Sequence, residues 1–209
     1  MKKFLLLVIL FISIPVYAKE NKLYFTENDN RIYYESKWLD ENVFMKHMDM
    51  IPGTSYTDEL IIENGTNTTY TLFFKVFAKE QSDVANELLE NIDMTILLND
   101  QVIYEGKATG LDYANNGINL QDVISLGEFN KSSKSKMVVN TTLSKEYNNI
   151  DNTESSYIDW TFYAQYEDSE PIEIVKVPST MKNSLMPLMS LIIMIIGIGV
   201  ICYAHKKED

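Results

Sequence analysis

The 209-residue chain contains a single cysteine, which excludes a disulfide framework and any multi-cysteine zinc or iron–sulfur site. Two histidines leave too little material for a histidine-ligated metal centre. Basic residues are also scarce, since 18 Lys and Arg stand against 30 Asp and Glu and give a formal net charge of −12. The acidic balance argues against a nucleic-acid partner, because no basic face is available to neutralise phosphates. The composition excludes several classes of function and names no ligand.

The first 18 residues, MKKFLLLVILFISIPVYA, have the parts of a secretory signal peptide. Two lysines precede the apolar run Phe4–Ile14, and small or branched residues lead to a cleavage site between Ala18 and Lys19. An uncleaved N-terminal anchor is the alternative, but the apolar run is short for a membrane span. No cysteine lies directly after the run, which excludes lipoprotein processing. We therefore predict a signal peptide at residues 1–18.

The segment Leu185–Ala204 contains no charged residue. At 1.5 Å per residue, a helix of this length spans about 30 Å, the thickness of the hydrocarbon core. His205, Lys206 and Lys207 follow at once, and the positive-inside rule places that end in the cytoplasm. A buried helix of a soluble domain is the alternative, which the uninterrupted length disfavours. We predict a single transmembrane helix at 185–204, with the N-terminus outside and a cytoplasmic tail at 205–209.

Between these two ends lies an exported segment that contains no cysteine. Exported domains of Gram-positive bacteria often lack disulfides, and the abundance of Asn, Lys, Ile and Tyr is typical of a low-GC genome. Glycosylation sequons occur at Asn64, Asn67, Asn130 and Asn140. They would carry glycans if the chain were a eukaryotic type I glycoprotein, which is a further alternative.

Three segments of the exported part, Thr69–Phe77, Lys136–Ser144 and Tyr157–Glu167, alternate apolar and polar residues with period two, which is typical of half-buried strands. We expect further strands at Leu23–Thr26, Arg31–Glu35, Tyr56–Glu63, Met94–Leu98, Val102–Glu105 and Ile124–Phe129. Turn-forming pairs separate them at Pro52-Gly53, Asn64-Gly65, Asn99-Asp100 and Asn116-Gly117. The pattern predicts an all-β fold, a single Ig-like or jelly-roll β-sandwich at residues 19–167.

One short helix interrupts the strand pattern. Ser82 is a suitable N-cap, and Asp83 lies where the helix dipole favours an anion. An apolar stripe then follows, made of Val84, Ala85, Leu88, Leu89 and Ile92. We expect this helix to cross between the two sheets and to cover one open end of the core.

Residues 168–184 show no period and contain two prolines, which predicts a stalk of at most about 55 Å. Within this segment, Val177-Pro178-Ser179-Thr180-Met181, followed by a spacer, an apolar span and a basic end, resembles a sortase sorting signal. Such signals read Leu-Pro-x-Thr-Gly, and the enzyme's cysteine attacks the Thr–Gly carbonyl. Pro178 and Thr180 match, Val177 replaces Leu, and Met181 stands where the signal has Gly. We favour a permanent anchor, and linkage through Thr180 to the wall or a pilus is the alternative.

The exported domain also resembles surface β-sandwich proteins of the camelysin/TasA type. The resemblance covers about Met50 to Gln165. The segments that carry it are Pro52-Gly53-Thr54, Leu60–Asn64, Ile103–Gly106, Ser125-Leu126-Gly127 and Asp159–Ala164. It implies a protein that forms or decorates cell-surface fibres and matrices, and the camelysin name implies a protease.

Catalytic motifs are missing from the sequence. There is no His-Glu-x-x-His and no Gly-x-Ser-x-Gly, and His47 is the one exported histidine. Its neighbours Met45, Met48 and Asp49 suggest a soft-metal site, but a strand histidine near core methionines is the favoured interpretation. We predict no catalytic, cofactor-binding or metal-binding residue.

Other acidic residues give no specific site either. Carboxylate pairs such as Glu27/Asp29 and Asp58/Glu59 are typical of a solvated surface. A structural calcium ion at Glu27–Asn30 or Asn149–Asn152, and an internal Lys–Asn isopeptide bond, stay open.

These features together predict a non-enzymatic, single-pass cell-membrane protein whose extracellular domain is a structural or adhesive binding module. The expected partners are another surface protein, a fibre or a wall polymer, and no small-molecule substrate. Addition of a strand to an exposed sheet edge is the simplest binding mode for such a fold. A sortase-processed wall or pilus component and a camelysin-like exported protease are the alternatives.

Overall fold

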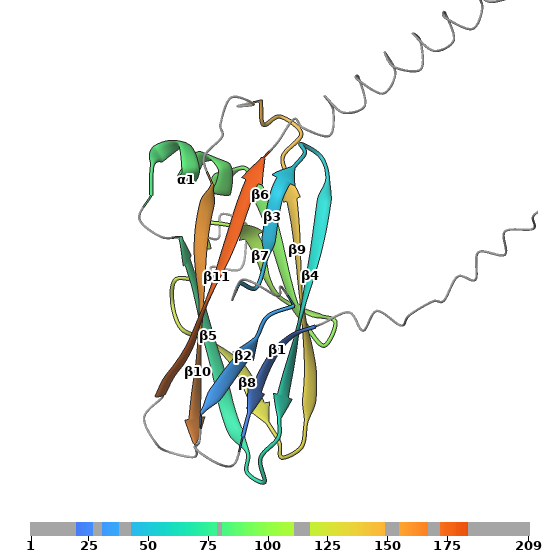
Figure 1. The fold of residues 1–209 in the computed structure, drawn as a ribbon, viewed down its shortest axis with the longest axis vertical. Coiled ribbons are helices and arrows are strands. Elements are labelled where there is room, and N and C mark those ends of the chain that lie inside the picture. The colour runs from blue at the N-terminus through green and yellow to red at the C-terminus, as the bar shows by residue number, and fades with distance from the viewer. Residues whose placement is uncertain are drawn as a thin grey trace, which may run out of the picture.

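The computed structural model describes residues 20–26, 31–37, 43–78, 81–110, 118–148, 155–166 and 172–183. These residues form a two-sheet β-sandwich with one short helix, as predicted (Figure 1). The described part includes no helix long and apolar enough to cross a membrane. The predicted signal peptide with its cleavage site at Ala18 and Lys19, and the predicted span Leu185–Ala204, lie outside the described residues.

One sheet, which we call sheet A, has six strands. In spatial order they are β2 (Ile32–Glu35), β1 (Asn21–Phe25), β4 (Ser55–Asn64), β9 (Lys134–Leu143), β6 (Ile92–Leu98) and β7 (Gln101–Lys107). All neighbours are antiparallel except β1, which runs parallel to β4. The N-terminal strand is therefore inserted within the sheet, between an edge strand and a central one.

The second sheet, sheet B, has five strands. In spatial order they are β3 (Lys46–Met50), β11 (Ile172–Asn183), β10 (Ser156–Tyr166), β5 (Tyr70–Ala78) and β8 (Ile124–Phe129). Here β11 runs antiparallel to β10 and parallel to β3. In Figure 1, β11 and β3 lie side by side and point to the same end of the sandwich.

The core lies between the sheets and is built from the alternate residues that the sequence predicts. Phe74 of β5 and Trp160 and Phe162 of β10 are fully buried. Phe44, which precedes β3, packs edge-on against Trp160 with ring centroids 5.2 Å apart. Burial of each such side chain contributes about 1.5–3 kcal/mol, so these rings contribute much of the free energy that stabilises the packing of the two sheets.

The helix α1 (Asp83–Glu90) joins β5 of sheet B to β6 of sheet A, so the expected crossover is confirmed. Ser82 caps it, since its side chain accepts a hydrogen bond from the Ala85 N–H at 3.1 Å. Ala85, Leu88 and Leu89 are buried, but Val84 is 38 % exposed. At 100° per residue, Val84 lies at the margin of the stripe, which corrects its assignment to the core.

The predicted stalk at 168–184 is corrected by the structure, because β11 occupies residues 172–183 inside sheet B. The sequence concealed this strand in two ways. Proline is rare in a central strand, yet the Pro178 carbonyl accepts a hydrogen bond from the Phe44 N–H at 2.9 Å. Ser179 is a polar residue at an inward position, where its hydroxyl accepts from the Met45 N–H at 3.2 Å. The sandwich therefore extends to residue 183.

Candidate functional site

A buried carboxylate lies between the two sheets. Asp58 of β4 has a side chain that is 1 % exposed, although the sequence analysis placed it on a solvated surface. Its Oδ2 lies 2.6 Å from Nε2 of His47 on β3, and its Oδ1 lies 2.7 Å from Nζ of Lys37. Because β4 belongs to sheet A and β3 to sheet B, these contacts join the sheets at one side of the sandwich.

The two basic side chains determine the charge of this group. Burial alone would raise the pKa of Asp58, but the close approach of His47 and Lys37 to its two oxygens outweighs burial and holds the pKa below its usual range. Asp58 is therefore a carboxylate at neutral pH. Nε2 of His47 is in close contact with this carboxylate but is not aligned with it as in a hydrogen bond. The centroid of the Tyr56 ring lies 4.8 Å from that of the His47 ring, so the two side chains are in contact.

Asn21, the first residue of β1, connects the same region. Its Nδ2 donates to the Phe44 carbonyl at 3.1 Å and to the Glu59 carbonyl at 3.2 Å. Its Oδ1 accepts from the Lys37 N–H and from the Tyr34 hydroxyl, both at 2.9 Å. Burial raises the pKa of Tyr34, so its hydroxyl keeps the proton that it donates. One amide thus ties β1, β2, β4 and the start of β3 together.

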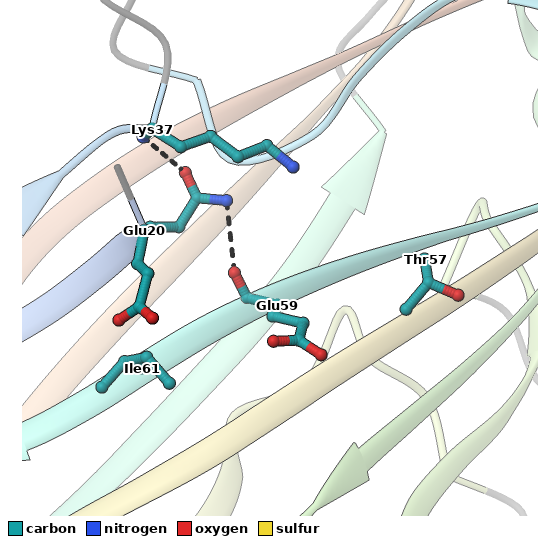
Figure 2. A pocket seen from close by; sticks show the side chains of 6 residues that line it. Glu20, Lys37, Thr57, Glu59 and Ile61 are labelled. Atoms are coloured by element: carbon teal, nitrogen blue, oxygen red, sulfur yellow. Dashed lines mark hydrogen bonds between the residues drawn. The ribbon is translucent and has the colours of Figure 1, made fainter. Parts of the chain in front are cut away.

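A small cavity of about 180 Å³ opens beside this network (Figure 2). It is lined by Glu20, Asn21, Lys37, Thr57, Glu59 and Ile61. The Asn21 amide accepts a hydrogen bond from the Lys37 N–H and donates one to the Glu59 carbonyl. Dashed lines in Figure 2 mark these hydrogen bonds at Lys37 and Glu59. The Glu59 carboxylate is engaged by Lys136 at 2.5 Å, and the Lys37 ammonium by Asp58. The charges of Lys37 and Glu59 are therefore matched within the protein.

The environment of His47 is that of a strand histidine, the favoured interpretation of the sequence. It lies on β3, and its imidazole is held by Asp58 and Tyr56. Met45 is fully buried and Met48 is half-buried, while the Asp49 side chain is outside the described part. Within the described ranges, no three His, Cys, Asp or Glu side chains gather at a distance suited to a metal ion.

The sequence does contain a signal for the burial of Asp58. In the predicted strand Tyr56–Glu63, Asp58 has the same parity as Leu60 and Ile62, which are fully buried. A charge on the apolar face of a strand needs a partner, and that rule alone identifies the position as unusual. Its partners Lys37 and His47 come from other strands and have no local signal.

The residues that resemble a sorting signal lie in β11. Val177, Ser179 and Met181 point inward and are buried. β11 is paired with β10 on one side and with β3 on the other, and the Thr180 N–H donates to the Met45 carbonyl at 3.0 Å. The Thr180–Met181 peptide bond therefore belongs to an interior strand of the sheet.

A second buried polar group lies at the other end of β4. Asn64 is fully buried, and its Nδ2 donates to the carbonyls of Thr68, Phe129 and Asn130 at 2.8, 2.9 and 3.0 Å. Its Oδ1 accepts from the Thr66 N–H at 2.9 Å. A glycan cannot be attached to this amide, so one of the four sequons is structural. Both segments considered for calcium, Glu27–Asn30 and Asn149–Asn152, lie outside the described residues.

No protein-family model matches the sequence, and no curated protein matches it significantly. Among solved structures, the chain is similar at low identity to β-sandwich domains of bacterial adhesins and pilins. CfaE, the adhesive subunit of CFA/I fimbria of enterotoxigenic Escherichia coli, is 8 % identical with a TM-score of 0.33, over 69 % of this chain and 46 % of that chain. The collagen-binding domain of a Staphylococcus aureus adhesin is 14 % identical with a TM-score of 0.28, over 68 % and 99 %.

A protein of another kind also matches. AvmM, which catalyses macrocyclization in alchivemycin A biosynthesis, is 7 % identical with a TM-score of 0.39, over 69 % of this chain and 84 % of that chain. Because an enzyme and several adhesins match the same sandwich at such scores, this likeness does not transfer a function.

Proposed function

We propose that the chain is a non-enzymatic cell-surface protein, held in the cell membrane by Leu185–Ala204, whose sandwich is a structural or adhesive binding module. The observation that carries the proposal is the position of β11. This strand completes sheet B and ends at Asn183, two residues before the apolar stretch begins. A folded domain that closes where an anchor starts is suited to presentation directly at the membrane surface.

The polar groups of the described sandwich support a binding role over catalysis. The carboxylates of Asp58 and Glu59 are engaged by Lys37 and Lys136, and the His47 imidazole is engaged by Asp58. None of these contacts pairs a hydroxyl or thiol nucleophile with a base, which is the arrangement that hydrolysis through a covalent intermediate requires. The partner is another surface protein, a fibre or a wall polymer. The resemblance of residues 50–165 to camelysin/TasA-type surface proteins agrees with such a role.

A sortase-processed wall or pilus component is the first alternative. A sortase needs its substrate as a free extended peptide, whereas Val177–Met181 is paired with β10 along its length and with β3 at Thr180 and Met181. The burial of Met181 adds to this argument, because cleavage after Thr180 would remove that side chain from the core. The pairing therefore favours the permanent anchor.

Intact mass measurement of the protein from separated membrane and wall fractions tests the anchor. We expect a membrane-fraction species that spans Lys19–Asp209. A wall-fraction species that ends at Thr180 with a peptidoglycan or pilin remnant would instead establish sorting.

A camelysin-like exported protease is the second alternative. It predicts hydrolysis that a chelator inhibits and that depends on His47. We expect the purified full chain to leave denatured casein intact, and we expect His47→Gln to change stability only. Hydrolysis by the native sequence that is lost in His47→Gln at unchanged folding would overturn the non-enzymatic proposal.

A further inference from the structure

The outer face of sheet B carries aromatic side chains around one lysine. Phe73, Lys75 and Phe77 occupy alternate outward positions of β5 and are half-buried. On the neighbouring strand β10, Tyr163 pairs with Phe73, and Thr161 pairs with Lys75. Outward positions of a solvent-facing sheet are usually polar, so three aromatic rings placed on either side of one lysine form an unusual surface.

Lys75 differs from the lysines of the opposite face. Its Nζ lies 5.6 Å from the centroid of the Tyr163 ring and 5.8 Å from that of Phe77. Within the described part of the chain it has no carboxylate at ion-pair distance, whereas Lys22, Lys107 and Lys136 on sheet A each have one at 2.5–2.7 Å. A ring attracts an ammonium group without neutralising its charge. Lys75 therefore retains a full positive charge on an aromatic surface.

Thr161 adds an unsatisfied polar group to the same surface. It is fully buried, and its hydroxyl has no hydrogen-bond partner among the described residues. Its cross-strand neighbours are Lys75 on one side and Lys176 on the other. Buried hydroxyl groups nearly always have a partner, and this one lies next to lysine side chains on the outer face of the sheet, where a bound ligand would supply it.

We propose that this surface, formed by Phe73, Lys75, Phe77, Thr161 and Tyr163, binds a polysaccharide that carries carboxylates. The proposal rests on the surface role proposed above and names the partner as a wall polymer of acidic sugars. Aromatic rings stack against the flat C–H face of a pyranose, and the Lys75 ammonium pairs with the sugar carboxylate. As Lys75 turns toward that carboxylate, the Thr161 hydroxyl becomes accessible to a sugar hydroxyl.

Charge complementarity selects this occupant over the others. The chain as a whole is acidic, with a net charge of −12, so an anionic polymer is repelled except near a cation that no carboxylate pairs. The same face carries Asp159 opposite Phe77, but among the described residues no carboxylate lies at ion-pair distance from Lys75. A glycerol phosphate chain would satisfy Lys75 but offers no flat face to the three rings. An apolar peptide would cover the rings but leave the ammonium group desolvated without an anion, which is unfavourable.

The test uses the full chain in non-ionic detergent and polygalacturonate as the probe, with binding measured by titration calorimetry. We expect binding that Lys75→Gln weakens about tenfold and that Thr161→Val weakens about threefold, with Lys75→Arg close to the native sequence. The matched control is Lys136→Gln, which removes a paired lysine from the outer face of sheet A and should change the affinity less than about twofold.

Three further polymers complete the test. Neutral dextran, polyglutamate and polyphosphate should each bind at least about tenfold more weakly than polygalacturonate. Equal binding of polyphosphate or polyglutamate would overturn the requirement for a sugar, and equal loss in Lys75→Gln and Lys136→Gln would overturn the site. The membrane-fraction mass of the native protein is independent of these results, so failure here is distinguishable from failure of the proposed anchor.

Discussion

Strand β4 of sheet A contacts sheet B through two buried polar side chains, which we call the Asp58 fastening and the Asn64 fastening, and the two differ in chemistry. Asp58 reaches His47 on β3, one edge of sheet B, and Asn64 donates to the carbonyl of Phe129 on β8, the other edge. The first is a buried charge balanced by two basic side chains, and the second is a neutral amide that donates to backbone carbonyls. The comparison shows that one strand uses both available ways to bury a polar group, and that only the first depends on pH.

The largest expected effect comes from replacing the hydrogen-bond donor group of Asn64 with an acceptor. Asn64→Asp replaces an NH₂ group that donates to three carbonyls with an oxygen that they repel. We expect the free energy of unfolding to fall by about 4 kcal/mol. Urea unfolding followed by the fluorescence of the buried Trp160 measures it. The control is Asn67→Asp at an exposed position of the same turn, and an equal loss in both variants would contradict the assignment.

The Asp58 fastening should be the next most costly to remove. Asp58→Ala leaves His47 and Lys37 without their carboxylate, and we expect a loss of about 3 kcal/mol in the free energy of unfolding. Glu59→Ala, at the next position on the exposed face, removes an ion pair with Lys136 and should cost less than about 1 kcal/mol. If both variants lost the same stability, Asp58 would be no more than a surface charge.

Lowering the pH should remove the stability that the Asp58 fastening contributes and leave the contribution of the Asn64 fastening unchanged. The pKa of Asp58 is lowered in the folded protein, so the folded state binds fewer protons than the unfolded state. The stability that this contributes is fully present above the unfolded pKa of about 3.9 and is lost as the pH falls through the folded pKa.

The expected measurement is a set of unfolding curves between about pH 5 and pH 2. The difference in stability between the native sequence and Asp58→Asn should narrow over this range. The difference between the native sequence and Asn64→Ala should stay constant, because an amide does not titrate. A constant difference for Asp58→Asn would show that its pKa is not lowered.

The smallest effect is expected on the exposed side of the same strand pair. Lys136→Gln removes the ion pair with Glu59, whose two side chains are each about half exposed. We expect less than about 0.5 kcal/mol, and a further decrease of this small effect in high salt. A loss of more than about 1 kcal/mol in thermal unfolding would mean that exposed pairs contribute to the sandwich as the buried pair does.

Much of the sandwich could be predicted from local pattern. Alternation identified the strands that face water on one side, and Asn99-Asp100 was identified as a turn because both residues adopt positive φ readily. The order of the strands could not be predicted in this way. The parallel pairs of β1 with β4 and of β3 with β11 join segments far apart in the chain, which no local pattern encodes.

The polar fastenings were missed for a related reason. The alternation that identifies β4 also places Asp58 inward, but the compensating charges of Lys37 and His47 come from β2's end and from β3. Ser179 likewise looked like linker composition because its partner, the Met45 N–H, is 134 positions away. The alternation pattern therefore predicts which residues are buried, but it does not predict which residues supply their hydrogen-bond and ion-pair partners.

The position of β11 also determines how the domain would respond to tension. Any pull transmitted through residue 183 acts along the axis of a strand that is paired on both sides. Because the hydrogen bonds of an antiparallel pair are perpendicular to the strands, such a pull shears many of them together instead of peeling them one by one. A surface protein held at this strand would therefore resist extraction better than one held at an edge strand.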